Sequence, residues 1–511
     1  MVRSPLSVVT SRRAVLRQMV FGAALAGPLL ALTNCGGSAT ATVSTESAST
    51  SSAIAASAAS TVGAPATSVS ASAASTTLAR AAVVSTTGAA PTSAAAATAP
   101  AGKGLTLQVA SWQKTEQGKQ GYATLAAEYA KVNPNVKIEQ QIIPATLADY
   151  NNKVTAQLAG GTAPDLMESI WGLGQNLAVK GALQALDTYV ARDKISTSDY
   201  VQAALELGRW PQKTGKYYAW YTMFSVTPLY YNTALFQQAG QAPPDESWTW
   251  QTVLEVAQKL TKKGTGAADS TFGYSPTYLT RSMLYAYGWD FATADGTKSA
   301  LDSQQSIDAM QFWQDLIYKY QVCPPASLQF GKGAPAGVFS TTRLGMEIQA
   351  TYQIGSYRQV KDLEWDVAVP PSGPAGRFTV VKGAPGHAIP TQSPHASDAW
   401  AFLSWWITHQ TPTLVVLEGN LPSKLSALQG YPQAAQKDNP APVHIGLLPD
   451  IATKYGRAVQ VLPDNDNVKK PYYTERANIL ANKEDAKTGM TKAAQQMNGL
   501  LQAAIAAQAK S

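Results

Sequence analysis

The residues that could carry chemistry in this sequence form no familiar catalytic or metal-binding pattern. The four histidines, His387, His395, His409 and His444, do not show metal-ligand spacing. The sequence has no H-E-x-x-H, G-x-S-x-G or C-x-x-C motif, and Gly331-Lys332-Gly333 lacks the spacing of a phosphate-binding loop. A pair of glycosidase carboxylates stays open, because geometry and not spacing defines such pairs. We expect no catalytic residue, no metal and no cofactor.

Aromatic residues are the other candidates for a chemical role. The chain has 12 Trp and 22 Tyr. Such rings pack well in a core, and they also stack on the apolar faces of sugar rings. A sugar site needs these faces together with amides, carboxylates or arginines that satisfy the hydroxyls. The aromatic content alone leaves both roles open.

One stretch, residues 215–261, organises the elements that must position such side chains. Gly215-Lys216 predicts a turn, and an apolar segment rich in strand-forming residues follows over 226–231. A short helix predicted over 234–239 should end at Gly240, because glycine adopts positive φ without strain.

A proline break and a second helix complete this stretch. Pro243 and Pro244 prevent the first helix from continuing, and the apolar spacing over 250–260 predicts an amphipathic helix. This order of elements resembles the family 1 extracellular solute-binding proteins of ABC importers, the maltose-binding-like group, and the resemblance extends over residues 105–505. It implies an α/β fold of the periplasmic-binding-protein type II, with two lobes and three crossings between them.

The resemblance also implies how the chain is divided. It places the first crossing within the organising stretch, the second at 382–389 and the third at 419–423. The first lobe is then expected at 105–224 plus 389–421, and the second lobe at 225–388 plus 422–511.

The first 35 residues are predicted to be an export signal. Arg12 and Arg13 resemble a twin-arginine signal, and the apolar run over 19–32 is too short for a membrane span. The segment ending at Cys35 is similar to a bacterial lipobox, although Asn34 stands where that pattern has a small residue. We expect lipidation of Cys35, and a plain signal peptide cleaved elsewhere is the alternative.

The segment 36–104 is rich in Ala, Ser and Thr and should be a disordered linker, because it cannot bury enough apolar surface. Six basic residues and one acid lie within residues 1–104, so most of the net charge of +7 belongs to this part. The remainder is near neutral, which gives no reason to expect nucleic acid as a partner. Cys35 and Cys323 are not expected to pair.

The resemblance places ligand-binding residues on loops after the strands and at the crossings. Trp112 is the first choice for a ring that stacks on the ligand. Core packing is the alternative for Trp112, Tyr278 and Trp289, and a structural hinge histidine is the alternative for His387. The full set of expected ligand-binding residues is Trp112, Glu116, Glu168, Trp171, Tyr221, Tyr278, Trp289, Tyr352, Gly386, His387 and Tyr473.

These observations together predict a monomeric, lipid-anchored binding protein outside the cytoplasm. The expected partners are a sugar or oligosaccharide and the membrane permease of an ABC importer, and no bond of the ligand is made or broken. A secreted carbohydrate-active enzyme and a ligand-sensing subunit of a surface receptor are the alternatives.

Overall fold

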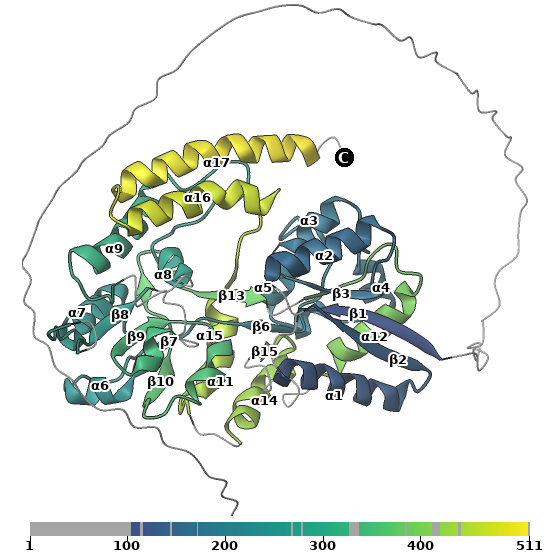
Figure 1. Cartoon of the computed structure of the whole chain (residues 1–511), viewed down its shortest axis with the longest axis horizontal. Coiled ribbons are helices and arrows are strands. Elements are labelled where there is room, and N and C mark those ends of the chain that lie inside the picture. The colour runs from purple at the N-terminus through teal and green to yellow at the C-terminus, as the bar shows by residue number, and fades with distance from the viewer. Residues whose placement is uncertain are drawn as a thin grey trace, which may run out of the picture. The chain divides into compact units, whose positions relative to one another are not determined.

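The computed structural model describes residues 104–508 apart from 113–115, 144–145, 171, 267–268, 277–279, 326–336, 384–385, 411–419 and 438–440. The predicted export signal with Arg12, Arg13 and Cys35, and nearly all of the predicted linker, lie outside the described residues. The described part contains three four-stranded sheets, one in each of two lobes and one where the chain crosses between them (Figure 1).

The first lobe is built on the sheet β14-β3-β1-β2. β1 is parallel to β2, with Leu105 opposite Val136, and it is also parallel to β3, whereas β14 is antiparallel to β3. Parallel neighbours need crossover connections, and the helices α1 and α2 supply them here. The bounds are β1 Leu105–Ser111, β2 Val136–Ile142, β3 Leu166–Ser169, β14 Gly386–Ala388, α1 Glu116–Val132, α2 Leu147–Ala159, α3 Leu173–Val179, α4 Asp187–Arg192, α5 Gln202–Leu205 and α12 Ala396–Thr408.

The second lobe is built on the sheet β10-β7-β9-β8. β7 is antiparallel to both β10 and β9, and β8 is parallel to β9. Figure 1 shows the last two helices, α16 and α17, lying side by side on this lobe. The bounds are β7 Leu229–Asn232, β8 Phe272–Ser275, β9 Leu344–Ile348, β10 Trp365–Ala368, α6 Thr233–Gln238, α7 Trp250–Leu260, α8 Arg281–Ala286, α9 Gln304–Tyr318, α11 Ile354–Tyr357, α16 Asn465–Leu480 and α17 Ala486–Gln508.

A third sheet, β15-β6-β13-β16, joins the chain segments that cross between the lobes. Lys382 of β13 lies opposite Ser225 of β6, and Leu421 of β15 lies opposite Phe224 on the other side of β6. Parts of all three predicted crossings are therefore hydrogen-bonded to one another. The bounds are β6 Met223–Ser225, β13 Thr379–Gly383, β15 Leu421–Pro422, β16 Gly456–Ala458, α14 Leu425–Gln436 and α15 Leu448–Tyr455, with short pairs β4 Arg209–Trp210 with β5 Lys216–Tyr217 and β11 Ser372–Gly373 with β12 Gly376–Arg377.

One apolar cluster runs from the first lobe through the crossings into the second lobe. It includes Met167 of β3, Phe224 of β6, and Tyr230 and Trp365 of the second-lobe sheet, all of them buried. Burial of such large side chains contributes about 1.5–3 kcal/mol each. The crossings are thus stabilised by packing as well as by hydrogen bonds, and residues of both lobes belong to the same hydrophobic cluster.

Candidate functional site

A cavity of about 330 Å³ lies between the two lobes, beside the crossing sheet. This interlobe cavity has two walls. The first-lobe wall includes Asn151 of α2, Gln175 of α3 and Tyr221 just before β6. The second-lobe wall is formed by side chains of α8, β13 and α16, namely Arg281, Lys382, Asp466, Lys469, Tyr473 and Arg476.

Tyr221 is fixed at the junction of the two walls. Its hydroxyl donates to the Ser169 carbonyl oxygen at 3.0 Å, and burial raises its pKa to about 12, so it stays a neutral donor. A Cβ at Gly383 or Gly386 would lie 2.2 Å or 2.6 Å from the Tyr221 ring. Only glycine fits at these two crossing positions, because any Cβ at such distances overlaps the ring.

Three polar atoms in the cavity walls are buried and have no hydrogen-bond partner in the described part of the chain: Asn151 Oδ1, Gln175 Oε1 and Arg281 Nε. The Gln175 amide nitrogen is engaged, since it donates to the Leu207 carbonyl oxygen. A buried polar group without a partner costs about 1–3 kcal/mol. These two acceptors and one donor suit a ligand with hydroxyl groups, because each hydroxyl can both donate and accept a hydrogen bond.

Two of the ligand-binding residues expected from the sequence, Tyr221 and Tyr473, lie in the wall of the interlobe cavity. Tyr473 is 37% exposed and its hydroxyl accepts from Arg281 Nη2 at 2.9 Å. Trp171 and Tyr278 lie outside the described residues. The other seven expected residues are placed elsewhere than in this wall.

Three of these seven belong to a buried polar network inside the first lobe. Glu168 accepts from the Trp112 backbone N–H at 2.6 Å and from the Tyr122 hydroxyl at 2.8 Å, and that hydroxyl also lies 2.6 Å from His387 Nε2. Burial lowers the pKa of His387 to about 3, so the imidazole is neutral. In this structure Glu168 and His387 connect β3, α1 and β14, and the Trp112 side chain is half-buried against the core.

The remaining four are spread over the chain. Trp289 has no exposed surface and packs in the second-lobe core, and Glu116 is exposed and pairs with Lys119 at 2.6 Å. The Tyr352 ring lies 5.6 Å from Lys382 Nζ, next to a residue of the cavity wall. Gly386 lies against the Tyr221 ring, where a Cβ would overlap the ring. A ligand-binding role for all of these residues stays a prediction.

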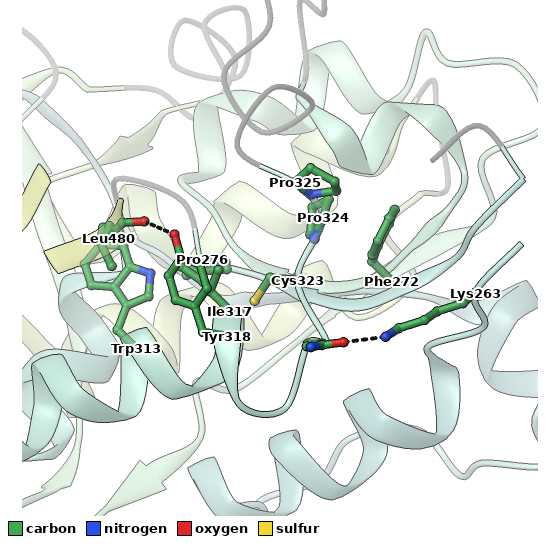
Figure 2. Close-up of a pocket in the computed structure, with 11 residues that line it drawn as sticks. Lys263, Phe272, Pro276, Trp313, Ile317, Tyr318, Cys323, Pro324, Pro325 and Leu480 are labelled. Carbon is green, nitrogen blue, oxygen red and sulfur yellow. Dashed lines mark hydrogen bonds between the residues drawn. The ribbon is translucent and has the colours of Figure 1, made fainter. Parts of the chain in front are cut away.

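A second cavity of about 320 Å³ lies within the second lobe alone. Figure 2 shows its apolar lining, which includes Trp313, Phe272 and the buried thiol of Cys323. Tyr318 donates to the Leu480 carbonyl oxygen at 2.8 Å and Lys263 donates to Gln321, whereas Trp313 Nε1 is buried without a partner among the described residues. Because it touches one lobe and offers few polar groups, it is a weaker candidate than the interlobe cavity.

Sequence reasoning missed the basic side chains of the interlobe cavity. No motif or spacing in the sequence marks Arg281, Lys469 or Arg476 as a cavity residue. In the structure they meet because α8 and α16 both line the interlobe cavity. Among the described helices, none is both long and apolar enough to cross a membrane.

Comparison with known proteins identifies relatives of this architecture. The family model described as bacterial extracellular solute-binding protein matches residues 112–411. A binding protein of Brucella abortus is 22% identical over 282 residues, which are 53% of this chain and 65% of that protein. The arabinooligosaccharide-binding protein of Halalkalibacterium halodurans is 27% identical over 176 residues, which are 34% of this chain and 37% of that protein.

Among solved structures, the ABC substrate-binding protein from Listeria monocytogenes in complex with cycloalternan aligns with a TM-score of 0.64 at 21% identity. That alignment covers 78% of this chain and 99% of the Listeria chain. At this level of identity the likeness concerns the fold, and it confirms the two-lobed α/β architecture expected from the sequence.

Proposed function

Because this chain belongs to the bacterial extracellular solute-binding protein family, we propose that it captures a sugar or oligosaccharide in its interlobe cavity and delivers it to the permease of an ABC importer. The observation that carries the proposal is a set of buried polar atoms in the two walls that have no partner among the described residues, namely Asn151 Oδ1, Gln175 Oε1 and Arg281 Nε. Sugar hydroxyls would complete all three. The names of the relatives, one of which binds an arabinooligosaccharide, favour the same class of ligand.

The arrangement of the walls favours capture by closure. Asn151 and Gln175 belong to the first lobe, whereas Arg281 belongs to the second, so a ligand that satisfies all three must contact both lobes. Such a ligand stabilises the closed state by its additional contacts there. The crossing sheet holds the lobes together at one side, and small backbone changes in its strands would provide the hinge.

The protein is proposed to act as a monomer outside the cytoplasm, exported through Arg12 and Arg13 and anchored by lipid at Cys35, and to leave its ligand chemically unchanged. The motivation is the sequence pattern ending at Cys35. Cells grown with a radioactive fatty acid should label the wild-type protein and not a Cys35→Ser variant. Equal label in both proteins would rule out this anchor.

A binding experiment with the full chain tests capture. Titration calorimetry against neutral and acidic mono- and disaccharides should identify a ligand, and Asn151→Ala or Gln175→Ala should weaken its binding by about tenfold, the worth of one hydrogen bond. Asn152→Ala is the matched control, because Asn152 is exposed on the same helix and outside the cavity wall.

Two outcomes would contradict the proposal. Wild-type affinity in both cavity variants would show that the ligand binds elsewhere. Release of a cleaved product during incubation, followed by chromatography, would instead indicate a carbohydrate-active enzyme.

A further inference from the structure

The second-lobe wall of the interlobe cavity is strongly basic. It carries Arg281, Lys382, Lys469 and Arg476, whereas Asp466 is the single carboxylate among the lining residues that the structure describes. A neutral saccharide needs no such excess of positive charge, because amides and single charged groups satisfy its hydroxyls. The excess of positive charge therefore bears on the charge of the ligand.

Arg281 lies at the centre of this basic wall. Its Nη2 donates to the Tyr473 hydroxyl at 2.9 Å, and its Nε is buried without a partner among the described residues. Burial lowers the pKa of both Lys382 and Lys469, and the nearby charge of Arg281 lowers each of them further. Cations that affect one another in this way repel, and an anion bound among them would relieve the repulsion.

Two other carboxylates of the second lobe form ion pairs with cations outside the cavity wall. Asp290 pairs with Arg457, and Glu475 pairs with Lys492 at 2.9 Å. In the part of the chain that the structure describes, no ion pair reaches Arg281. Among the lining residues that the structure describes, four cations thus share the cavity with one carboxylate, Asp466.

Lys469 shows the same imbalance at a buried position. Its side chain is only 2% exposed, it donates to the Gln460 carbonyl oxygen, and its Nζ lies 4.1 Å from the centre of the Phe291 ring. Both of these partners are neutral. Burial and the charge of Arg281 lower the pKa of Lys469 by more than the charges of Asp290 and Asp466 raise it. Burying such a cation costs free energy, and proteins accept such costs mainly at functional sites.

We propose that the ligand is an acidic saccharide, a sugar carrying a carboxylate or a phosphate, whose anionic group is held by Arg281, Lys382 and Lys469. This inference rests on the proposed function and specifies the substrate class of the same cavity. The planar guanidinium of Arg281 matches the paired oxygens of either anion, and the lysines add charge and single donors. The hydroxyls of the sugar then meet Asn151 and Gln175 on the opposite wall.

Matched pairs of ligands test the charge requirement with the full chain. Titration calorimetry compares galacturonic acid with galactose and glucose 6-phosphate with glucose, and inorganic phosphate serves as the anion alone. In at least one pair the acidic member should bind at least tenfold more tightly, and that pair distinguishes carboxylate from phosphate. Arg281→Gln should abolish the preference, whereas Lys470→Gln should keep it, because Lys470 is an exposed lysine of α16 that lies next to Lys469 in sequence and outside the cavity wall.

The outcomes separate this inference from the proposed function. If neutral sugars bind as tightly as their acidic partners, capture of a saccharide stands and the anionic ligand is refuted. If inorganic phosphate binds in an Arg281-dependent manner while no sugar binds, the anion site stands and both the acidic saccharide and the proposed function fail. Circular dichroism checks that Arg281→Gln is folded, and Lys382→Gln is the second variant if it is not. Retention of the acidic preference in the folded variant would overturn the proposal.

Discussion

Affinity for galacturonic acid should fall about tenfold between pH 7 and pH 9, and about tenfold again by pH 10. The cause is Lys382, whose pKa is lowered to about 8 by burial and then by the charge of Arg281. Well below pH 8 the free protein already holds this proton, so Lys382 adds no pH dependence of the affinity there. Above pH 8 the proton has to be taken up on binding, because the bound carboxylate raises the pKa of Lys382 again. The sugar carboxylate itself does not titrate in this range.

Other titratable groups also face Lys382, so variants are needed to assign the effect. Arg281, Lys469, Arg476 and Asp466 line the same cavity, as do Tyr221 and Tyr473, and the Tyr352 ring lies 5.6 Å from Lys382 Nζ. Lys382→Arg should bind galacturonic acid with no fall between pH 7 and pH 9, because its guanidinium keeps its charge. Lys469→Met should bind more weakly but retain the fall. Calorimetry in two buffers of different ionisation enthalpy measures the proton uptake directly, and a wild-type affinity independent of pH up to 9 would exclude Lys382 as the group.

The elements of the fold were predictable where local signals agree. The helix predicted over 250–260 is α7, Trp250–Leu260, because Thr249 caps it and one face is buried in the second-lobe core. The three crossings were found from the resemblance, and the structure shows that they pair with each other in one sheet. That pairing joins residues nearly 200 positions apart, such as Phe224 and Leu421, and no local pattern carries such information.

The site was less predictable than the fold, for two physical reasons. Aromatic rings serve the core and a sugar site equally well, so composition did not separate Trp289, which is fully buried, from Tyr473, which lines the cavity. The sequence pattern also did not predict the helix α16, because Pro471 lies inside it and a proline usually ends a helical pattern. Lys469, one of its cavity residues, therefore had no predicted element to position it.

Replacing Glu347 with Gln should remove a strong pH dependence of stability. Glu347 lies on β9, is 2% exposed and accepts a hydrogen bond from the Tyr357 hydroxyl. Burial raises the pKa of its carboxyl from 4.5 to about 8. Between these two values the folded protein holds a proton that the unfolded chain has released, so the free energy of unfolding falls as the pH rises. The expected slope from this group is about 1.4 kcal/mol per pH unit, or about 4 kcal/mol between pH 5 and pH 8.

Urea unfolding of the wild type and of Glu347→Gln at pH 5, 6, 7 and 8 measures this slope. The amide of Gln is neutral at every pH and keeps an acceptor for Tyr357, so the advantage of the variant should grow steadily up to pH 8 and then level off. Glu364→Gln is the control, since Glu364 is exposed immediately before β10 and its replacement should leave the slope unchanged. Parallel curves for the wild type and Glu347→Gln would mean that the buried carboxyl is ionised at neutral pH. Tyr357 would then be hydrogen-bonded to a charge, and the second-lobe sheet would contain a buried anion in place of a neutral acid.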